Sequence, residues 1–155
     1  MTKAYFLDSS ALVKRYVTET GSAWVQAICR PDAGNTLIIA RITWVEVLSA
    51  LARLQREMAL QPDRVATVIR SFRYDLDTQY QVVDLDRPLA EAAGQLVQQY
   101  PLRAYDAIQL ATALKLHPAL VRVIPSAYLF VSSDTRLLAV AQQVGLLTDD
   151  PANYT

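Results

Sequence analysis

Residues 4–13, Ala-Tyr-Phe-Leu-Asp-Ser-Ser-Ala-Leu-Val, decide the fold of this chain. The apolar run over residues 4–7 contains no breaker and predicts a buried strand. It ends at Asp8, and two hydroxyl residues, Ser9 and Ser10, then precede the apolar start of a helix that they can cap. An acid at the carboxyl end of a first buried strand points into the crevice where open α/β sheets bind ligands. Asp8 is therefore either a residue of a ligand site or only the cap of the helix.

The composition is that of a globular protein. The chain has 155 residues, of which 52% are hydrophobic and four are glycine, and this length predicts a single domain over residues 1–155. No apolar run approaches the ~18 residues that a membrane span requires, and the N-terminus lacks the pattern of a signal peptide. The one cysteine, Cys29, allows no internal disulfide. We therefore expect a cytoplasmic protein with no membrane partner.

Charge and residue types exclude several classes of site. The 15 basic and 15 acidic residues give a net charge of zero, which argues weakly against a nucleic-acid partner. Divalent cations bound to some of the acids would make the loaded protein basic, so the charge permits such a partner. The only histidine, His117, precedes a proline at a helix end, and neither a Ser-His-Asp triad nor a zinc site has the residues it needs. No glycine-rich phosphate loop is present.

Strand and helix patterns alternate along the chain. Short apolar runs predict further strands at residues 37–40, 81–85 and 128–131, and a short edge strand at 146–148. Helical patterns lie between them, at residues 10–17, 22–28, 43–58, 64–76, 87–99, 103–116 and 135–144. Pro118 is predicted to stop the sixth helix. The alternation predicts an α/β fold with a mostly parallel sheet of four to five strands, covered by helices on both faces.

Four acids have related positions in this pattern. Asp8, Glu46 and Asp134 each come just after a predicted strand, and the carboxyl ends of parallel strands meet at the same edge of a sheet. Asp106 lies instead inside a helix of small and apolar residues, where an unpaired carboxylate is costly. The sequence therefore predicts that acids gather at this edge.

Each acid also has a purely structural interpretation. The spacing Thr43-x-x-Glu46 is that of a capping box, in which Glu46 bonds back to the backbone of Thr43. Asp134 can be only the N-cap of the last helix. Asp106 can form a salt bridge with Arg103, three residues earlier on the same helix.

A shared cleft would give the four acids a chemical role. Carboxylates in one cleft raise each other's pKa unless a cation is present. A hard divalent ion such as Mg²⁺ or Mn²⁺ removes their mutual repulsion, because it is bound by a few carboxylates together with waters and phosphate oxygens. A site of this kind suits hydrolysis of phosphodiester bonds, because one metal ion activates water and a second stabilises the leaving oxygen.

Four stretches of the chain, in order and covering nearly its whole length, resemble the PIN-domain ribonucleases. Within that family the chain most resembles the VapC toxins of type II toxin–antitoxin pairs. The stretches are FLDSSALVK at residues 6–14, TWVEV at 43–47, RAYDAIQLATA at 103–113 and VSSDTRLL at 131–138.

The resemblance implies a three-layer α/β/α sandwich and an endoribonuclease that depends on Mg²⁺ or Mn²⁺. By motif position, the acids that bind metal and catalyse would be Asp8, Glu46, Asp106 and Asp134. Ser132 takes the place of the small hydroxyl residue before the last acid, and we expect it and Ser9 to support the acids or contact the substrate. Asp149 and Asp150 come considerably later, so no fifth ligand is assigned.

The resemblance also implies partners. They are an RNA substrate, a small antitoxin protein that covers the cleft, and a second copy of the chain in a homodimer. A different hypothesis remains open, in which the chain is a catalytically inactive PIN-like module that recruits a protein or RNA partner.

Overall fold

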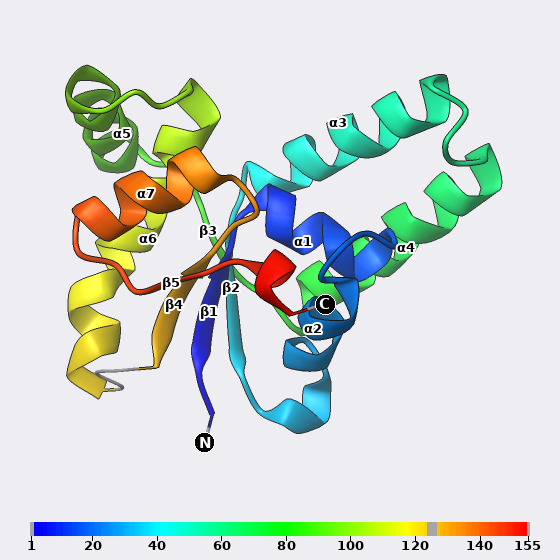
Figure 1. The fold of residues 1–155 in the computed structure, drawn as a ribbon, viewed down its shortest axis with the longest axis horizontal. Coiled ribbons are helices and arrows are strands. Elements are labelled where there is room, and N and C mark those ends of the chain that lie inside the picture. The colour runs from blue at the N-terminus through cyan, green and yellow to red at the C-terminus, as the bar shows by residue number, and fades with distance from the viewer. Residues whose placement is uncertain (1, 124–126, 155) are drawn as a thin grey trace.

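The structure is a computed structural model that describes residues 2–123 and 127–154 (Figure 1). Its centre is one sheet of five strands in the order β3-β2-β1-β4-β5, and all neighbouring strands are parallel. The strands are β1 (Ala4–Leu7), β2 (Thr36–Ala40), β3 (Gln81–Val83), β4 (Tyr128–Val131) and β5 (Thr148–Asp149). The predicted α/β fold with a parallel sheet is confirmed.

Helices cover both faces of this sheet, as Figure 1 shows. One face packs against α1 (Ser9–Tyr16), α2 (Ser22–Ile28), α3 (Thr43–Arg56) and α4 (Pro62–Thr78). The other face packs against α6 (Ala104–Val123) and α7 (Thr135–Gln143), and α5 (Arg87–Gln99) lies against α6. Two short 3₁₀ turns, Pro31–Ala33 and Pro151–Asn153, complete the described elements. This arrangement is the expected three-layer α/β/α sandwich.

The central strand β1 is buried on both faces. Tyr5 and Leu7 belong to the core on the side of α1–α4, and Ala4 and Phe6 belong to the core on the side of α6 and α7. This division follows from the strand geometry, since successive side chains point to opposite faces of a sheet. A strand with helices on both sides needs an unbroken apolar run, which is what residues 4–7 supply.

Most predicted boundaries are correct to within a few residues, but the prediction that Pro118 stops a helix is wrong. Pro118 lies inside α6, which continues to Val123. Proline lacks the N–H that would bond to the carbonyl four residues earlier, so it weakens this turn. The helix continues because Leu116 and Leu120, on either side of the proline, pack against the core. Tertiary packing therefore outweighs the local preference.

The strand order creates a switch point beside β1. The chain passes from β1 to β2 and β3 on one side, and then crosses to β4 on the other side. Open α/β sheets bind ligands at this reversal, outside the carboxyl ends of the strands. The backbone N–H of Asp8 donates to the carbonyl of Val131 at 3.1 Å, which joins the carboxyl ends of β1 and β4. The segments that follow these two strands therefore lie side by side.

None of the helices in the described part of the chain is long and apolar enough to cross a membrane.

Candidate active site

Asp8 connects β1 to α1 and has only 3% of its surface exposed. Its Oδ1 accepts hydrogen bonds from the backbone N–H of Ala11 at 2.9 Å and from Ser10 Oγ at 2.7 Å. Its Oδ2 accepts a bond from Ser132 Oγ at 2.6 Å, which comes from the end of β4. Asp8 is thus the N-cap of α1, and its second oxygen also links α1 to β4.

Burial raises the pKa of Asp8 to about 6. Loss of solvent is the largest cause, and it outweighs the hydrogen bonds from Ser132, Ser10 and Ala11, which favour the charged form. The nearby carboxylate of Glu46 raises the pKa further. Asp8 therefore occupies an electrostatically costly position that a nearby cation would relieve.

Glu46 lies in the first turn of α3 and is not part of a capping box. The N-cap of α3 is Ile42, which makes no side-chain cap, and Thr43 is buried at the first helical position. The Glu46 carboxylate turns away from its own backbone: Oε2 accepts from Ser9 Oγ at 3.0 Å, and Oε1 accepts from Gln109 Nε2 at 2.7 Å. The capping interpretation is wrong, because these bonds hold Glu46 toward α1 and α6.

Asp106 and Asp134 both form salt bridges with the guanidinium of Arg103. Arg103 donates from Nε to Asp106 Oδ2 and from Nη2 to Asp134 Oδ2, both at 3.2 Å. The other oxygen of Asp134, Oδ1, accepts from the backbone N–H groups of Arg136 and Leu137, so Asp134 is also the N-cap of α7. Both structural interpretations of these acids are thus correct, and neither moves the acids away from the cleft.

Hydroxyl groups connect the acids across the switch point. Ser132 Oγ donates to Asp8 Oδ2 and accepts from the backbone N–H of Asp134 at 3.0 Å. Ser10 Oγ donates to Asp8 and accepts from the backbone N–H of Ser133 at 2.9 Å. These bonds fix the orientation of Asp8 relative to the segment that carries Asp134.

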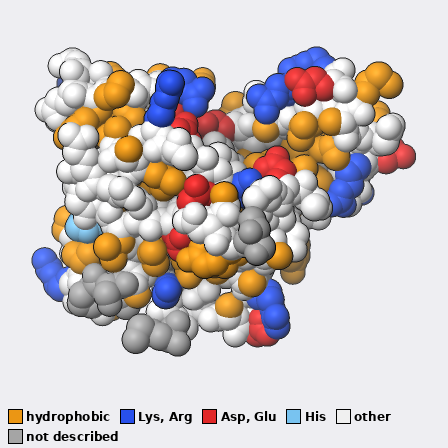
Figure 2. Space-filling view, viewed as in Figure 1, with side chains coloured by type: hydrophobic (Ala, Val, Ile, Leu, Met, Phe, Trp, Pro, Cys, Tyr) orange, Lys and Arg blue, Asp and Glu red, His pale blue; other side chains and the backbone are white. Residues whose placement is uncertain are grey.

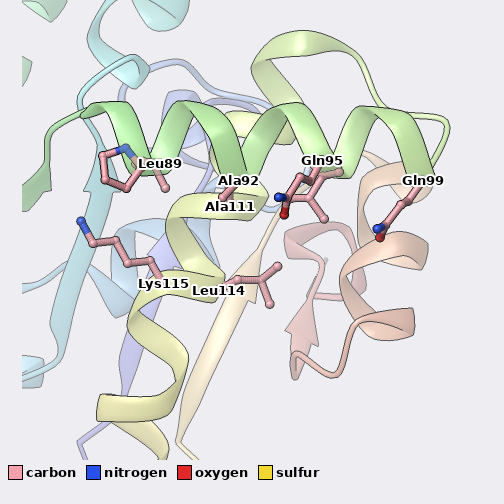
Figure 3. Close-up of a pocket in the computed structure, with 9 residues that line it drawn as sticks. Leu89, Ala92, Gln95, Gln99, Ala111, Leu114 and Lys115 are labelled. Carbon is pink, nitrogen blue, oxygen red and sulfur yellow. The ribbon is translucent and has the colours of Figure 1, made fainter.

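One cleft of about 220 Å³ is lined by all four predicted acids. In Figure 2, Asp and Glu side chains lie in the hollow between the two raised parts of the upper edge, with Lys or Arg side chains beside them. The residues that line the cleft are Asp8, Ser9, Ser10, Glu46, Arg103, Tyr105, Asp106 and Asp134. A larger groove of about 410 Å³ lies between α5 and α6 (Figure 3), and its walls are mostly apolar and contain no acid. The four predicted acids therefore line the smaller cleft and not the larger groove.

The fold and this arrangement of acids agree with the comparison to known families. A family model described as PIN domain matches residues 5–144. The chain belongs to the PIN domain family.

Curated proteins that are similar to this chain are named as VapC ribonucleases, and similar solved structures are named as a toxin–antitoxin complex or as VapBC2. The chain is 34% identical over 122 residues to Ribonuclease VapC45 and to Ribonuclease VapC49, from two strains of Mycobacterium tuberculosis, and the match covers 78% of this chain and 82% of each relative. Among solved structures, a toxin–antitoxin complex from Klebsiella pneumoniae has a TM-score of 0.59 at 21% identity, covering 87% of this chain and 90% of that one. VapBC2 from Rickettsia felis, bound to a DNA fragment from its promoter, has a TM-score of 0.61 at 11% identity, covering 95% and 98%. The two structures support the fold.

The residues of this PIN domain suit a hard divalent cation in their chemistry. Carboxylate and hydroxyl oxygens are the ligands that Mg²⁺ and Mn²⁺ prefer. Burial raises the pKa of Glu46 and of Asp106, as it does for Asp8, and neighbouring acids add to the effect. Among the described residues, however, no three His, Cys, Asp or Glu side chains are arranged to hold an ion in this conformation.

Gln109 does not line the cleft of this PIN domain but holds one of its acids, Glu46, and the sequence interpretation did not select it. Its side chain is buried in α6, and Nε2 donates both to Glu46 and to Thr43 Oγ1, the latter at 2.9 Å. Its Oε1 is buried with no hydrogen-bond partner among the described residues. The available signal was a polar residue in an apolar helix, three positions after Asp106 and so on the same helical face.

The remaining candidates lie elsewhere in this PIN domain. Asp149 accepts a hydrogen bond from the Tyr154 hydroxyl at 2.8 Å, and Asp150 caps the last 3₁₀ turn. Neither of them lines the cleft. His117 is half-buried, with its ring 6.2 Å from that of Tyr128, and is also outside the cleft.

Proposed function

We propose that this PIN-family chain is a metal-dependent endoribonuclease of the VapC type, which hydrolyses RNA phosphodiester bonds and is inhibited by an antitoxin. The observation that carries the proposal is the single cleft lined by Asp8, Glu46, Asp106 and Asp134, at the switch point of the sheet. Its two relatives at 34% identity are named ribonucleases, which supports the reaction class. We expect residues 1–155 to act as one domain in the cytoplasm.

The four acids would hold Mg²⁺ or Mn²⁺ in this proposal. A bound ion supplies a water of lowered pKa and stabilises the charge on the leaving oxygen. The rest of the site orients the acids: Ser10 and Ser132 hold Asp8, and Ser9 and Gln109 hold Glu46. Partners that fix a ligand's orientation contribute strongly to metal affinity. Because the pKa of Asp8 is about 6, metal binding would release protons below neutral pH.

Cleavage of a mixed RNA pool by the purified chain tests the reaction. We expect cleavage with Mg²⁺ or Mn²⁺ and none with a chelator. Asp8→Asn and Asp106→Asn should each reduce the rate by at least ~100-fold, the order expected when a charge-stabilising group is lost. Asp77→Asn, which makes the same change at an exposed position on α4, should cleave like the parent.

Two outcomes would contradict the proposal. Cleavage that persists in chelator would exclude metal dependence, and unchanged cleavage by Asp8→Asn and Asp106→Asn would exclude this cleft. RNA binding without cleavage under every metal condition would support the inactive binding module instead.

The antitoxin partner requires a separate experiment. An acidic cleft attracts a basic side chain, and arginine fits carboxylates best because its planar fork donates two parallel hydrogen bonds. We expect the antitoxin to be a small protein whose gene neighbours that of this chain, and we expect co-expression of the two to give a complex that does not cleave RNA. Full activity in that complex would exclude occlusion of the site. Sedimentation of the free chain would test the expected homodimer.

A further inference from the structure

Arg103 bridges two acids that come from different parts of the fold. Its Nε and Nη2 reach Asp106, in the first turn of α6, and Asp134, at the N-cap of α7. The Arg103 side chain is 80% exposed, whereas those of Asp106 and Asp134 are only 19% and 25% exposed. An exposed cation that lines the cleft thus neutralises two carboxylates that are largely shielded from solvent.

This bridge supplies the same charge compensation as a metal ion. Two carboxylates that face one another repel unless a positive charge lies between them. The guanidinium provides that charge and donates one hydrogen bond to each acid. The oxygens that accept these bonds, Oδ2 of Asp106 and Oδ2 of Asp134, belong to two of the four acids that line the cleft. Arg103 and a divalent ion would therefore compete for the negative charge of these two carboxylates.

Arg103 is also the contact of the cleft that is easiest to break. Asp8 and Glu46 are held by serine and glutamine side chains that are buried or half-buried. Arg103 donates only to Asp106 and Asp134 within residues 2–123 and 127–154. An exposed ion pair is weak, because water competes for both charges and a long side chain loses freedom in forming it. The guanidinium can swing into solvent without disturbing the core.

We propose that Arg103 is an internal counter-ion that competes with the divalent cation for Asp106 and Asp134. It keeps the metal-free cleft neutralised and raises the metal concentration at which the cleft fills. Binding of the ion displaces the guanidinium, which stays tethered to α6 at the mouth of the cleft beside Tyr105. This inference rests on the proposed function, since it requires a metal that binds these acids.

The experiment is a titration of the RNA-free chain with Mn²⁺, followed by calorimetry or by the electron paramagnetic resonance of free Mn²⁺. Arg103→Gln keeps a polar side chain and removes the competing charge. We expect it to bind Mn²⁺ about tenfold more tightly than the parent, within the range of ordinary coupling between sites. Arg103→Lys keeps one positive charge but loses the planar fork, so its affinity should lie between the two.

Arg136→Gln is the matched control. Arg136 is an exposed arginine in the first turn of α7, and its side chain makes no hydrogen bond or ion pair within the described residues. Its removal changes the charge near the cleft without breaking the bridge. We expect its Mn²⁺ affinity to stay within about twofold of the parent, because exposed charges are screened by salt.

The outcomes separate this inference from the proposed function. Equal or weaker Mn²⁺ binding by Arg103→Gln, with normal binding by the parent, overturns the competition and leaves the metal site intact. Equal tightening in Arg136→Gln also overturns it, because the effect would then come from general charge. Absence of Mn²⁺ binding in both the parent and Arg103→Gln overturns the inference together with the metal dependence of the proposed function.

Discussion

Single residues in this cleft combine a helix cap with a second contact across the cleft. Asp8 caps α1 through one oxygen and joins Ser132 through the other, and Asp134 caps α7 while its second oxygen pairs with Arg103. A carboxylate has two oxygens with room for several donors, so capping does not exclude another function. The sequence leaves open whether each of these two acids is a helix cap or a site residue. Because one carboxylate can serve in both ways, the two interpretations are compatible.

The pKa of Asp8 predicts a pH dependence of stability. Its folded value of about 6 lies above the ordinary aspartate value of 3.8, so between these pH values the folded protein keeps a proton that the unfolded chain has lost. Stability from this group is present below pH 4 and falls as the pH rises through 6, by about 3 kcal/mol in total. In chelator, Asp8→Asn should lose less free energy of unfolding than the parent between pH 4 and 7.

Urea unfolding of both proteins at several pH values measures this difference. The comparison cancels the contributions of other acids, including Glu46, whose pKa is also raised. If the free energies of unfolding of parent and variant changed with pH in parallel, burial would not disfavour the charged form of Asp8.

Two substitutions of Glu46 separate its charge from its packing. Glu46→Gln retains atoms that can bond to Ser9 and Gln109, so it should melt within about 2 °C of the parent. Its RNA cleavage should fall by at least ~100-fold, because the charge is gone. Glu46→Ala removes the acceptor for the buried Gln109 amide as well, and should lose a further ~1–3 kcal/mol of stability.

Glu57→Gln, at the exposed far end of α3, is the control for charge and should leave cleavage unchanged. Parental cleavage by Glu46→Gln would remove Glu46 from the active site.

At the scale of elements, α6 supplies both an acid of the cleft and a side chain that holds another acid. Its first turn carries Asp106, and one turn later Gln109 reaches across to α3. Residues three apart on a helix lie on one face, so a single helix delivers both an acid and the group that orients another acid.

Gln109→Leu tests this connection between α6 and α3. The amide hydrogen bond favours the charged form of Glu46, so its loss should raise the pKa of Glu46 further. We expect cleavage ~10–100-fold slower, in the range found for partners that orient metal ligands, and a pH profile displaced to higher pH. Gln98→Leu, on the exposed surface of α5, should change neither. A slower enzyme with an unmoved pH profile would indicate a packing role alone.

Pro118 lowers the stability of the last turns of α6, because proline cannot donate the backbone hydrogen bond that another residue would make there. Alanine restores the N–H that can bond to the carbonyl of Leu114 and removes the clash of the ring with that turn. Pro118→Ala should therefore stabilise the protein by about 1 kcal/mol, or raise its melting temperature by about 2–4 °C. Thermal unfolding measures the shift, and a lower melting temperature would show that proline fits this turn better than the helix geometry implies.

For the whole molecule, the order of the strands decides where chemistry is located. The reversal beside β1 brings residues from the N-terminal and C-terminal parts of the chain into one cleft. A ligand that binds there joins segments that separate on unfolding, so it should stabilise the whole fold.

Metal binding should accordingly raise the melting temperature of the parent. A ligand at a hundredfold excess over its dissociation constant adds about 2.7 kcal/mol to the free energy of unfolding. Millimolar Mg²⁺ or Mn²⁺ should produce a clear rise for the parent and a much smaller one for Asp106→Asn. A parent whose melting is insensitive to both ions would count heavily against a metal site.

The sequence alone determined the elements and the edge at which the acids meet. Unbroken apolar runs, helical periodicity and breakers are local signals, and they located the five strands and seven helices of the described residues to within a few positions, except for the end of α6, which lies seven residues beyond its predicted end. The placement of Asp8, Glu46 and Asp134 after parallel strands followed from these signals, because parallel strands end at a common edge. The interpretation of residues 103–113 as a mostly buried helix did not by itself bring Asp106 to this edge, and its assignment to the site came from the resemblance to the PIN family.

Only the tertiary structure decided which partner each side chain takes. The bonds of Glu46 to Ser9 and Gln109, and of Arg103 to Asp134, join residues 37, 63 and 31 positions apart. No local pattern encodes contacts over such sequence separations. The spacing Thr43-x-x-Glu46 therefore fitted a capping box as well as it fitted the observed bonds of Glu46 to Ser9 and Gln109. The passage of α6 through Pro118 was undecidable for the same reason, since the burial of Leu120 depends on the sheet beneath it. Periodicity fixes which face of an element is buried, but contacts between elements exist only once the chain has packed.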